Sequence, residues 1–247
     1  ESVDDGVKAL TGAAKEHGIK LMLDIAIDRI ADASNQGSAV VFDPRRSPQE
    51  SGSRTIDITH ETQLLDDWRR RLARLAGLGI AGFRCIGIGK VAPDVWKGLI
   101  AAARSAVSDT IFLAWTPGTS FEDRKALKGV GFDGSFSSFA WWNMEERWIL
   151  DEYEVQRELG YQITFPEAPF GKRMAHGIDG TEVSERRAVR SLKLASTFAS
   201  GLMVPMGFEY GSSIPLDPLT GDGMGLRGLK DQGVFDLSSD IRAINAA

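Results

Sequence analysis

Six short apolar segments alternate with segments of helical periodicity along this chain, and that alternation constrains the fold more than any other feature. The apolar segments span 19–27, 80–86, 110–116, 131–139, 161–165 and 201–206. The first is apolar almost throughout, which is typical of a parallel strand covered on both faces. Strands that alternate with helices indicate a parallel sheet, either open or closed into a barrel.

Helical periodicity fills the stretches between these strands. The stretch 61–76 is the clearest, because Leu64, Leu65, Trp68, Leu72 and Leu75 form one apolar stripe. Further helices are predicted at 3–17, 92–107, 121–128, 143–159 and 182–200, with a last short helix introduced by 236–240. We expect one domain over 1–247, with 28–60 as a long loop or small excursion after the first strand.

Composition excludes several classes of partner. The net charge of −5 argues against a nucleic-acid partner, which usually needs a basic face. Lys and Arg are scattered, and no apolar run approaches the roughly 20 residues of a membrane helix, so no membrane partner is expected. A single cysteine, Cys85, allows no intrachain disulfide and fits a cytoplasmic location.

The sequence offers no site for a cofactor or a metal. No GxGxxG follows the first strand and no GxxxxGK[ST] occurs, and Gly87–Lys90 has the wrong spacing for a phosphate loop. Three scattered histidines and one cysteine do not form a metal-ligand pattern. Cys85 is expected to be a buried apolar filler, because its side chain points away from the face that carries Arg84 and Ile86.

A series of short motifs follows the predicted strands in a fixed order. The segments are His17–Asp24, Ala81–Arg84, Ile111–Ala114, Gly131–Asp133, Trp141–Asn143, Phe165–Arg173 and Gly201–Gly211. Their order resembles the catalytic barrel of the alpha-amylase superfamily, glycoside hydrolase family 13. Within it, the likeness is greatest to the glucan maltosyltransferases that use maltose 1-phosphate. The resemblance implies an α/β fold, a (β/α)8 TIM-type barrel that lacks its first two strands in this chain. Residues before Val3 cannot supply those strands, so we expect either a fragment or an unusually built barrel, since six strands cannot close in the eight-strand geometry.

The resemblance also locates the positions where catalysis would occur. A retaining glycosidase needs a carboxylate nucleophile and a carboxylic acid roughly 5 Å apart. The matching positions hold Ile86 and Trp115, while the third carboxylate falls at Phe170 and the usual histidine at Arg29. No Asp or Glu occurs between 82 and 93 that a shift in register could bring in. The sequence therefore predicts that the catalytic carboxylates have been replaced.

The remaining polar residues at strand ends are the candidates for function. Glu167 is the surviving candidate for a general acid or base, although a bond to the nearby backbone or to Arg173 is the preferred interpretation. Asp24 and Arg84 are candidates to line a sugar pocket, but a structural ion pair between adjacent strand ends is favoured, because buried charges are tolerated only when paired. Arg173 is a further candidate for substrate binding, as the resemblance implies.

Three tryptophans at strand ends offer a second route to sugar binding, because aromatic faces pack against the apolar faces of sugar rings. For Trp115, the sequence favours equally a role in binding glucan and a role in packing the space left by the lost carboxylates and substrate. The pair Trp141–Trp142 is expected to belong to the core.

The leading hypothesis is a catalytically degenerate maltosyltransferase-like domain in alpha-glucan metabolism. Its partners would be an alpha-glucan or maltooligosaccharide and an active maltosyltransferase domain or subunit. One rival is a working hydrolase or transferase that uses Glu167 with a relocated acid such as Asp24 or Glu209. The other is a purely structural interaction domain.

Overall fold

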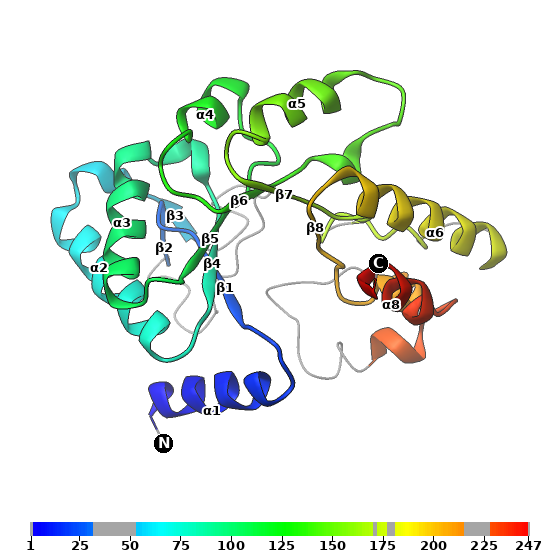
Figure 1. The fold of residues 1–247 in the computed structure, drawn as a ribbon, viewed down its shortest axis with the longest axis horizontal. Helices are drawn as coiled ribbons and strands as arrows, with labels where there is room; N and C mark the ends of the chain where they lie inside the picture. Colours follow the sequence, from blue (N-terminus) through cyan, green and yellow to red (C-terminus); the bar gives the residue numbers. More distant parts are fainter. Residues whose placement is uncertain (1, 32–52, 170–171, 177–180, 215–227, 247) are drawn as a thin grey trace.

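The main sheet has six parallel strands in the order β1-β4-β5-β6-β7-β8 (Figure 1). The computed structural model describes residues 2–31, 53–169, 172–176, 181–214 and 228–246. The strands are β1 (Met22–Ile25), β4 (Gly82–Cys85), β5 (Ile111–Ala114), β6 (Gly134–Phe136), β7 (Tyr161–Thr164) and β8 (Gly201–Leu202). All six predicted strands are present, and the predicted parallel sheet is confirmed.

Helices separate the strands as the periodicity predicts. They are α1 (Val3–Glu16), α2 (Thr62–Gly77), α3 (Pro93–Ala106), α4 (Phe121–Ala126), α5 (Trp148–Gln156), α6 (Thr181–Phe198) and α8 (Ser238–Ala246). Short 3₁₀ turns follow several strands, at η2 (Ile58–His60), η3 (Ile88–Lys90), η4 (Phe139–Trp141) and η5 (Phe208–Tyr210). None of the helices in the described ranges combines the length and apolar character needed to cross a bilayer.

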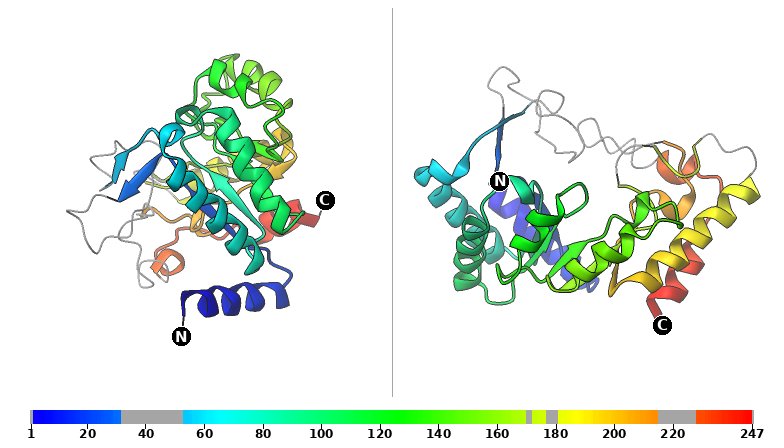
Figure 2. Two further views of the ribbon diagram at one scale, coloured as in Figure 1. Left: turned by 90° about the vertical axis from the view of Figure 1, so that its left-hand side faces the viewer. Right: turned by 90° about the horizontal axis from the view of Figure 1, so that it is seen from above.

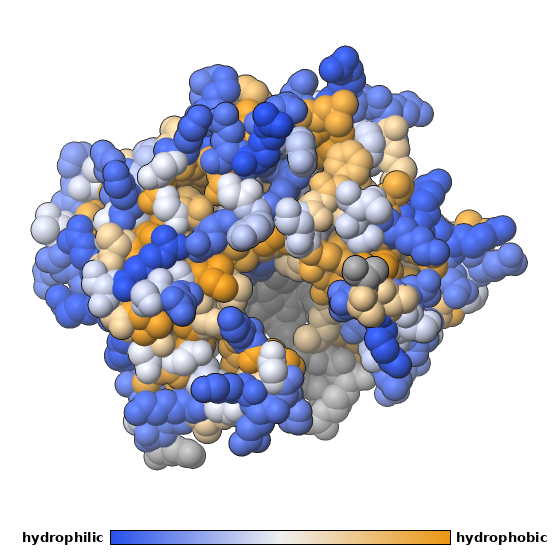
Figure 3. Space-filling view, in the orientation of Figure 1, coloured by the Kyte–Doolittle hydropathy of each residue, from blue (hydrophilic) through white to orange (hydrophobic). Residues whose placement is uncertain are grey.

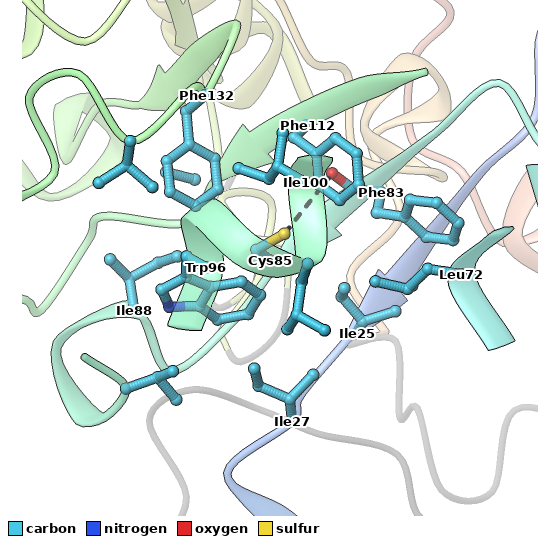
Figure 4. Close-up of a cluster of buried hydrophobic side chains, with 14 of the residues drawn as sticks. Ile25, Ile27, Leu72, Phe83, Cys85, Ile88, Trp96, Ile100, Phe112 and Phe132 are labelled. Atoms are coloured by element: carbon cyan, nitrogen blue, oxygen red, sulfur yellow. Dashed lines mark hydrogen bonds between the residues drawn. The ribbon is translucent and has the colours of Figure 1, made fainter. Parts of the chain in front are cut away.

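The two faces of the sheet belong to different cores, because successive side chains of a strand point to opposite faces. On the outer face, Phe83, Cys85 and Phe112 pack against Leu72 of α2 and Trp96 of α3 (Figure 4). On the inner face, side chains at or just beyond the carboxyl ends of the strands meet in a smaller group, here called the inner cluster, which comprises Ile86, Trp115, Phe136 and Phe165.

Helices α2 and α3 lie at one end of the molecule, and α6 and α8 lie at the other (Figure 2). Ala188 and Leu192 of α6 form a third core with Phe208 and Leu237, against which Ile241 of α8 packs. Within the described residues, β1 pairs only with β4 and β8 only with β7, so the sheet remains open between these two edges.

The predicted helix over 143–159 begins later than its periodicity suggested, at Trp148. The side chain of Asn143 accepts hydrogen bonds from the backbone N–H groups of Glu145 and Glu146, at 3.0 and 3.1 Å. Such a local turn competes with helix for the same backbone donors. Met144 also has a φ of 67°, which no right-handed helix permits.

The described parts of the segment 28–60 include a small antiparallel pair. Strand β2 (Arg29–Ala31) pairs with β3 (Ser53–Thr55), and Arg29 lies opposite Thr55. The intervening residues 32–52 lie outside the described residues.

Candidate functional site

A pocket of about 590 Å³ lies where β4, β5 and β6 end. Its described lining comes from Gly87–Lys90 after β4, from Trp115 and Pro117–Ser120 after β5, from Ser138 and Trp141 after β6, and from Asp123. Loops at the carboxyl ends of parallel strands converge on one rim, which is where α/β folds place their ligands. The pocket is therefore the candidate functional site.

Local sequence chemistry shapes the walls of this pocket. Gly87 has a φ of 73°, in the left-handed region, and turns the chain from β4 into η3. Ser120 caps α4, because its Oγ accepts the N–H of Asp123 at 3.1 Å and donates to Oδ2 of Asp123 at 2.6 Å. Lys90, Ser120 and Asp123 thus supply polar groups at the rim.

The inner cluster occupies the positions where the resemblance places the catalytic carboxylates. Trp115 is only 3% exposed; its ring stacks on Phe165 with centroids 5.4 Å apart, and the Phe136 centroid lies 5.1 Å away. Ile86 is 1% exposed in the same cluster. Neither side chain can attack a sugar carbon or shuttle a proton near neutral pH. Phe170, the third position, lies outside the described residues.

Asp24 and Arg84 form the predicted ion pair between adjacent strands. Arg84 Nε donates to Asp24 Oδ1 at 2.7 Å, and Arg84 Nη2 contacts Asp24 Oδ2. The guanidinium carbon also lies 4.9 Å from the ring centroid of Trp115 and 5.5 Å from that of Phe136. Arg84 therefore covers the inner cluster as a paired cation.

Glu167 makes both of the contacts that the sequence suggested for it. It accepts the N–H of Met174 at 2.5 Å, and its Oε1 lies 3.0 Å from Nη1 of Arg173. Burial raises the pKa of Glu167, and Glu209 acts in the same direction, while Arg173 and the Met174 N–H oppose the change. Arg173 also donates to the carbonyls of Met206 and Ser212, which ties the β7 and β8 ends together. Neither Glu167 nor Arg173 is among the described residues that line the pocket.

Asp28 and Arg29 are buried where β1 ends. Arg29, at the position of the usual histidine, places Nε 3.7 Å from Oδ2 of Asp28. Neither carboxylate oxygen of Asp28 has a hydrogen-bond partner among the described residues. Burial raises the pKa of Asp28, while Arg29 and Lys90 oppose that change.

The tryptophans divide differently from the prediction. The sequence predicts a core position for both Trp141 and Trp142, but Trp141 is 40% exposed and lines the pocket. Trp142 packs on Phe139 and Phe198 as expected. The difference arises because Trp141 ends the 3₁₀ turn η4, which directs neighbouring side chains to different sides.

Cys85 is buried on the outer face, as predicted, and burial raises the pKa of its thiol well above the usual range (Figure 4). Across the residues that the structure describes, no three His, Cys, Asp or Glu side chains are grouped so that they could hold a metal ion.

Sequence reasoning missed Ser120, Asp123 and Ser138 as pocket residues. The pair Ser120 and Asp123, three residues apart before a helical segment, carries a capping signal that could have located the loop. No comparable signal marks Ser138.

Known proteins that resemble this chain in sequence or in fold come from one superfamily. No family model matches the chain. The alpha-1,4-glucan:maltose-1-phosphate maltosyltransferase of Burkholderia pseudomallei is 32% identical over 259 residues, which cover 96% of this chain and 22% of that protein. The chain thus spans about a fifth of the length of this curated relative.

Solved structures show the same fold. An alpha-amylase from Lactobacillus plantarum matches with a TM-score of 0.65 at 18% identity, covering 96% of this chain and 60% of its own. The cyclic alpha-maltosyl-(1-->6)-maltose hydrolase from Arthrobacter globiformis matches with a TM-score of 0.62 at 13% identity, over 98% of this chain and 62% of that one. The six-stranded open sheet corresponds to part of their barrels. The chain belongs to the alpha-amylase superfamily.

Proposed function

We propose that the pocket at the ends of β4, β5 and β6 binds an alpha-glucan, and that the amylase type of catalysis is lost from this barrel. The likeness to a glucan maltosyltransferase and to amylases supports the choice of ligand. In the whole protein, the segment would hold a glucan chain for an active maltosyltransferase domain or subunit. A cytoplasmic location rests on the single cysteine and stays a prediction.

The observation that carries this proposal is that the pocket is bordered by aromatic and aliphatic side chains in place of the carboxylates that catalysis would need. Ile86 and Trp115 of the inner cluster stand where the resemblance would place the catalytic carboxylates, and neither offers a carboxylate to form a glycosyl intermediate. Trp141 meanwhile offers a half-exposed indole beside the polar rim of Lys90 and Asp123. An aromatic face with polar groups around it is the usual means of holding a neutral sugar.

Calorimetric titration with maltoheptaose tests the proposal. We expect a Kd of about 1 mM or tighter, which corresponds to roughly −4 kcal/mol, and no release of new reducing ends. Trp141→Ala should weaken binding about fivefold to tenfold, because the indole supplies the stacking face. Trp115→Ala is less informative, since Trp115 also supports the inner cluster.

Tyr161→Ala is the matched control, because Tyr161 is an exposed aromatic at the opposite end of β7 from the pocket. Its affinity for maltoheptaose should equal that of the wild type. Absence of binding by the folded wild-type chain would reject the glucan role and favour an interaction domain. Hydrolysis that Glu167→Gln abolishes would instead restore Glu167 as a catalytic residue.

A further inference from the structure

A second hollow lies at the opposite end of the sheet from the pocket, where strands β1, β4 and β5 begin. It has a volume of about 420 Å³ and is here called the α1 hollow. Helix α1 forms one of its sides and lies close to the start of β1 (Figure 1). The pocket and the α1 hollow share none of their described lining residues.

Helix α1 presents one face to the hollow. The lining residues Lys8, Thr11, Gly12 and Lys15 follow the spacing i, i+3, i+4 and i+7, which places them along a single side of a helix. The small residues Thr11 and Gly12 leave the middle of this face open, and a lysine stands at each end. Thr11 Oγ1 also donates to the carbonyl of Leu78 at 2.8 Å, which holds α1 beside the turn that precedes β4.

The wall opposite α1 is apolar. Leu21, Ile80 and Ile111 come from the residues at or just before the starts of β1, β4 and β5. Ile19 belongs to the same lining and is 55% exposed. The space-filling view shows hydrophobic surface next to the hydrophilic side chains of α1 (Figure 3). A ligand with an apolar body would therefore remove apolar surface from water by filling the hollow.

Charge narrows the class of ligand. Lys8, Lys15 and Lys20 border the hollow, and Asp109 is the one acid of its described lining. In the described part of the chain, none of these three lysines lies within ion-pairing distance of a carboxylate. Asp109 Oδ1 instead accepts a hydrogen bond from the hydroxyl of Ser108 at 2.9 Å. The hollow is thus cationic in a chain of net charge −5, and it favours an anion.

We propose that the α1 hollow is a binding site for an amphipathic anion, a molecule that combines an aliphatic body with one anionic group. The body would cover the apolar side chains at the strand starts, and the anionic group would lie among the three lysines. A glucan fits this site poorly, because its described lining carries no aromatic side chain on which a sugar ring could stack. The inference is independent of the function proposed for the pocket.

Calorimetric titration with decanoate tests this inference. We expect a Kd of about 1 mM or tighter. Hexanoate should bind at least about tenfold more weakly, because its shorter chain buries fewer methylene groups. Decanol, which has the same chain without the charge, should also bind more weakly than decanoate. Raising the NaCl concentration from about 20 mM to about 500 mM should weaken the binding of decanoate, because salt screens the lysines.

Gly12→Leu should weaken decanoate binding at least about tenfold, because the new side chain would occupy the middle of the hollow. No described atom lies within 4 Å of the Cβ position of Gly12, and leucine favours helix more than glycine does, so the variant should fold. Gly6→Leu is the matched control, since Gly6 lies in the same helix, is equally free of neighbours and is outside the described lining. Lys15→Gln should weaken decanoate binding about threefold.

Three results would overturn the site. They are decanoate binding that Gly12→Leu leaves unchanged, equal affinities for decanoate and hexanoate, and decanoate binding that persists undiminished when Lys8, Lys15 and Lys20 are all replaced by glutamine. Trp141→Ala should bind decanoate as the wild type does. Failure of the chain to bind maltoheptaose would therefore reject the glucan pocket and leave the α1 hollow in place.

Discussion

At the scale of single residues, Asp28 shows how the end of β1 tolerates a buried acid. Its side chain is 1% exposed, its two oxygens lack hydrogen-bond donors among the described residues, and Arg29 Nε approaches only to 3.7 Å. A buried carboxylate with so little compensation favours its protonated form, which is why its pKa is raised.

Asp28→Asn should therefore remove part of the pH dependence of stability. With its pKa higher in the folded than in the unfolded chain, Asp28 lowers the free energy of unfolding as pH rises above about 4. That loss is complete once the pH exceeds the pKa of Asp28 in the folded chain. Every tenfold difference in proton affinity between the folded and unfolded chains corresponds to about 1.4 kcal/mol. Denaturant unfolding from pH 3.5 to 8 measures the loss.

The variant should gain stability relative to the wild type as the pH rises. Glu167 also has a raised pKa, but it is present in both proteins and its contribution cancels in the difference. A difference in unfolding free energy that stays constant across this range would contradict the interpretation.

At the scale of elements, the turn from β4 into η3 decides the shape of one wall of the pocket. A Cβ at Gly87 would lie 2.7 Å from Oδ1 of Asp28, and the residue has a positive φ. Gly118, on the neighbouring wall, has a φ of 78°, but no described atom lies within 4 Å of its Cβ position. Alanine variants at the two positions therefore distinguish the cost of a strained backbone from the cost of steric overlap.

Gly87→Ala should lower the free energy of unfolding by about 3 kcal/mol, because it combines left-handed backbone strain with overpacking. Gly118→Ala is the matched control and should cost about 1 kcal/mol, from the backbone alone. Urea denaturation of both variants measures the difference. Equal losses would show that Asp28 can move aside and that the turn tolerates a side chain.

At the scale of the whole molecule, the open sheet should make local stability against opening higher at the central strands than at the edge strands. Strand β4 pairs on both sides, with β1 and β5, and its outer face is covered by α2 and α3. Strand β1 pairs on one side alone in the described part of the sheet, and Met22 and Leu23 are more than one-third exposed.

Hydrogen exchange should show this difference between the centre and the edge. Amides of residues 82–85 are expected to exchange by global unfolding, and those of 22–25 by smaller openings at the edge, at least about tenfold faster. Exchange followed by mass spectrometry on peptides that cover the two strands measures both. Equal protection of the two strands would mean that the edge of β1 is covered.

The sequence by itself determined the parallel alternation of strands and helices, because short apolar runs alternate with segments of helical periodicity. Its prediction that the first strand is covered on both faces was wrong, since Met22 and Leu23 at the edge of the sheet are more than one-third exposed. It also determined that Ile86 and Trp115 stand where the resemblance places catalytic carboxylates, and neither side chain can ionise usefully in any conformation. The pairing of Asp24 with Arg84 followed from the expectation that charges on adjacent strand ends meet.

Only the tertiary structure decided which of Trp141 and Trp142 lines the pocket, because the direction of Trp141 depends on the turn η4 and not on any periodic pattern. The same holds for Ser138 and Glu152, whose contact joins segments that are 14 residues apart in the chain. The bonds of Glu152 to Arg124 and Ser137 are likewise a product of packing, since they depend on how α4 and α5 meet the end of β6.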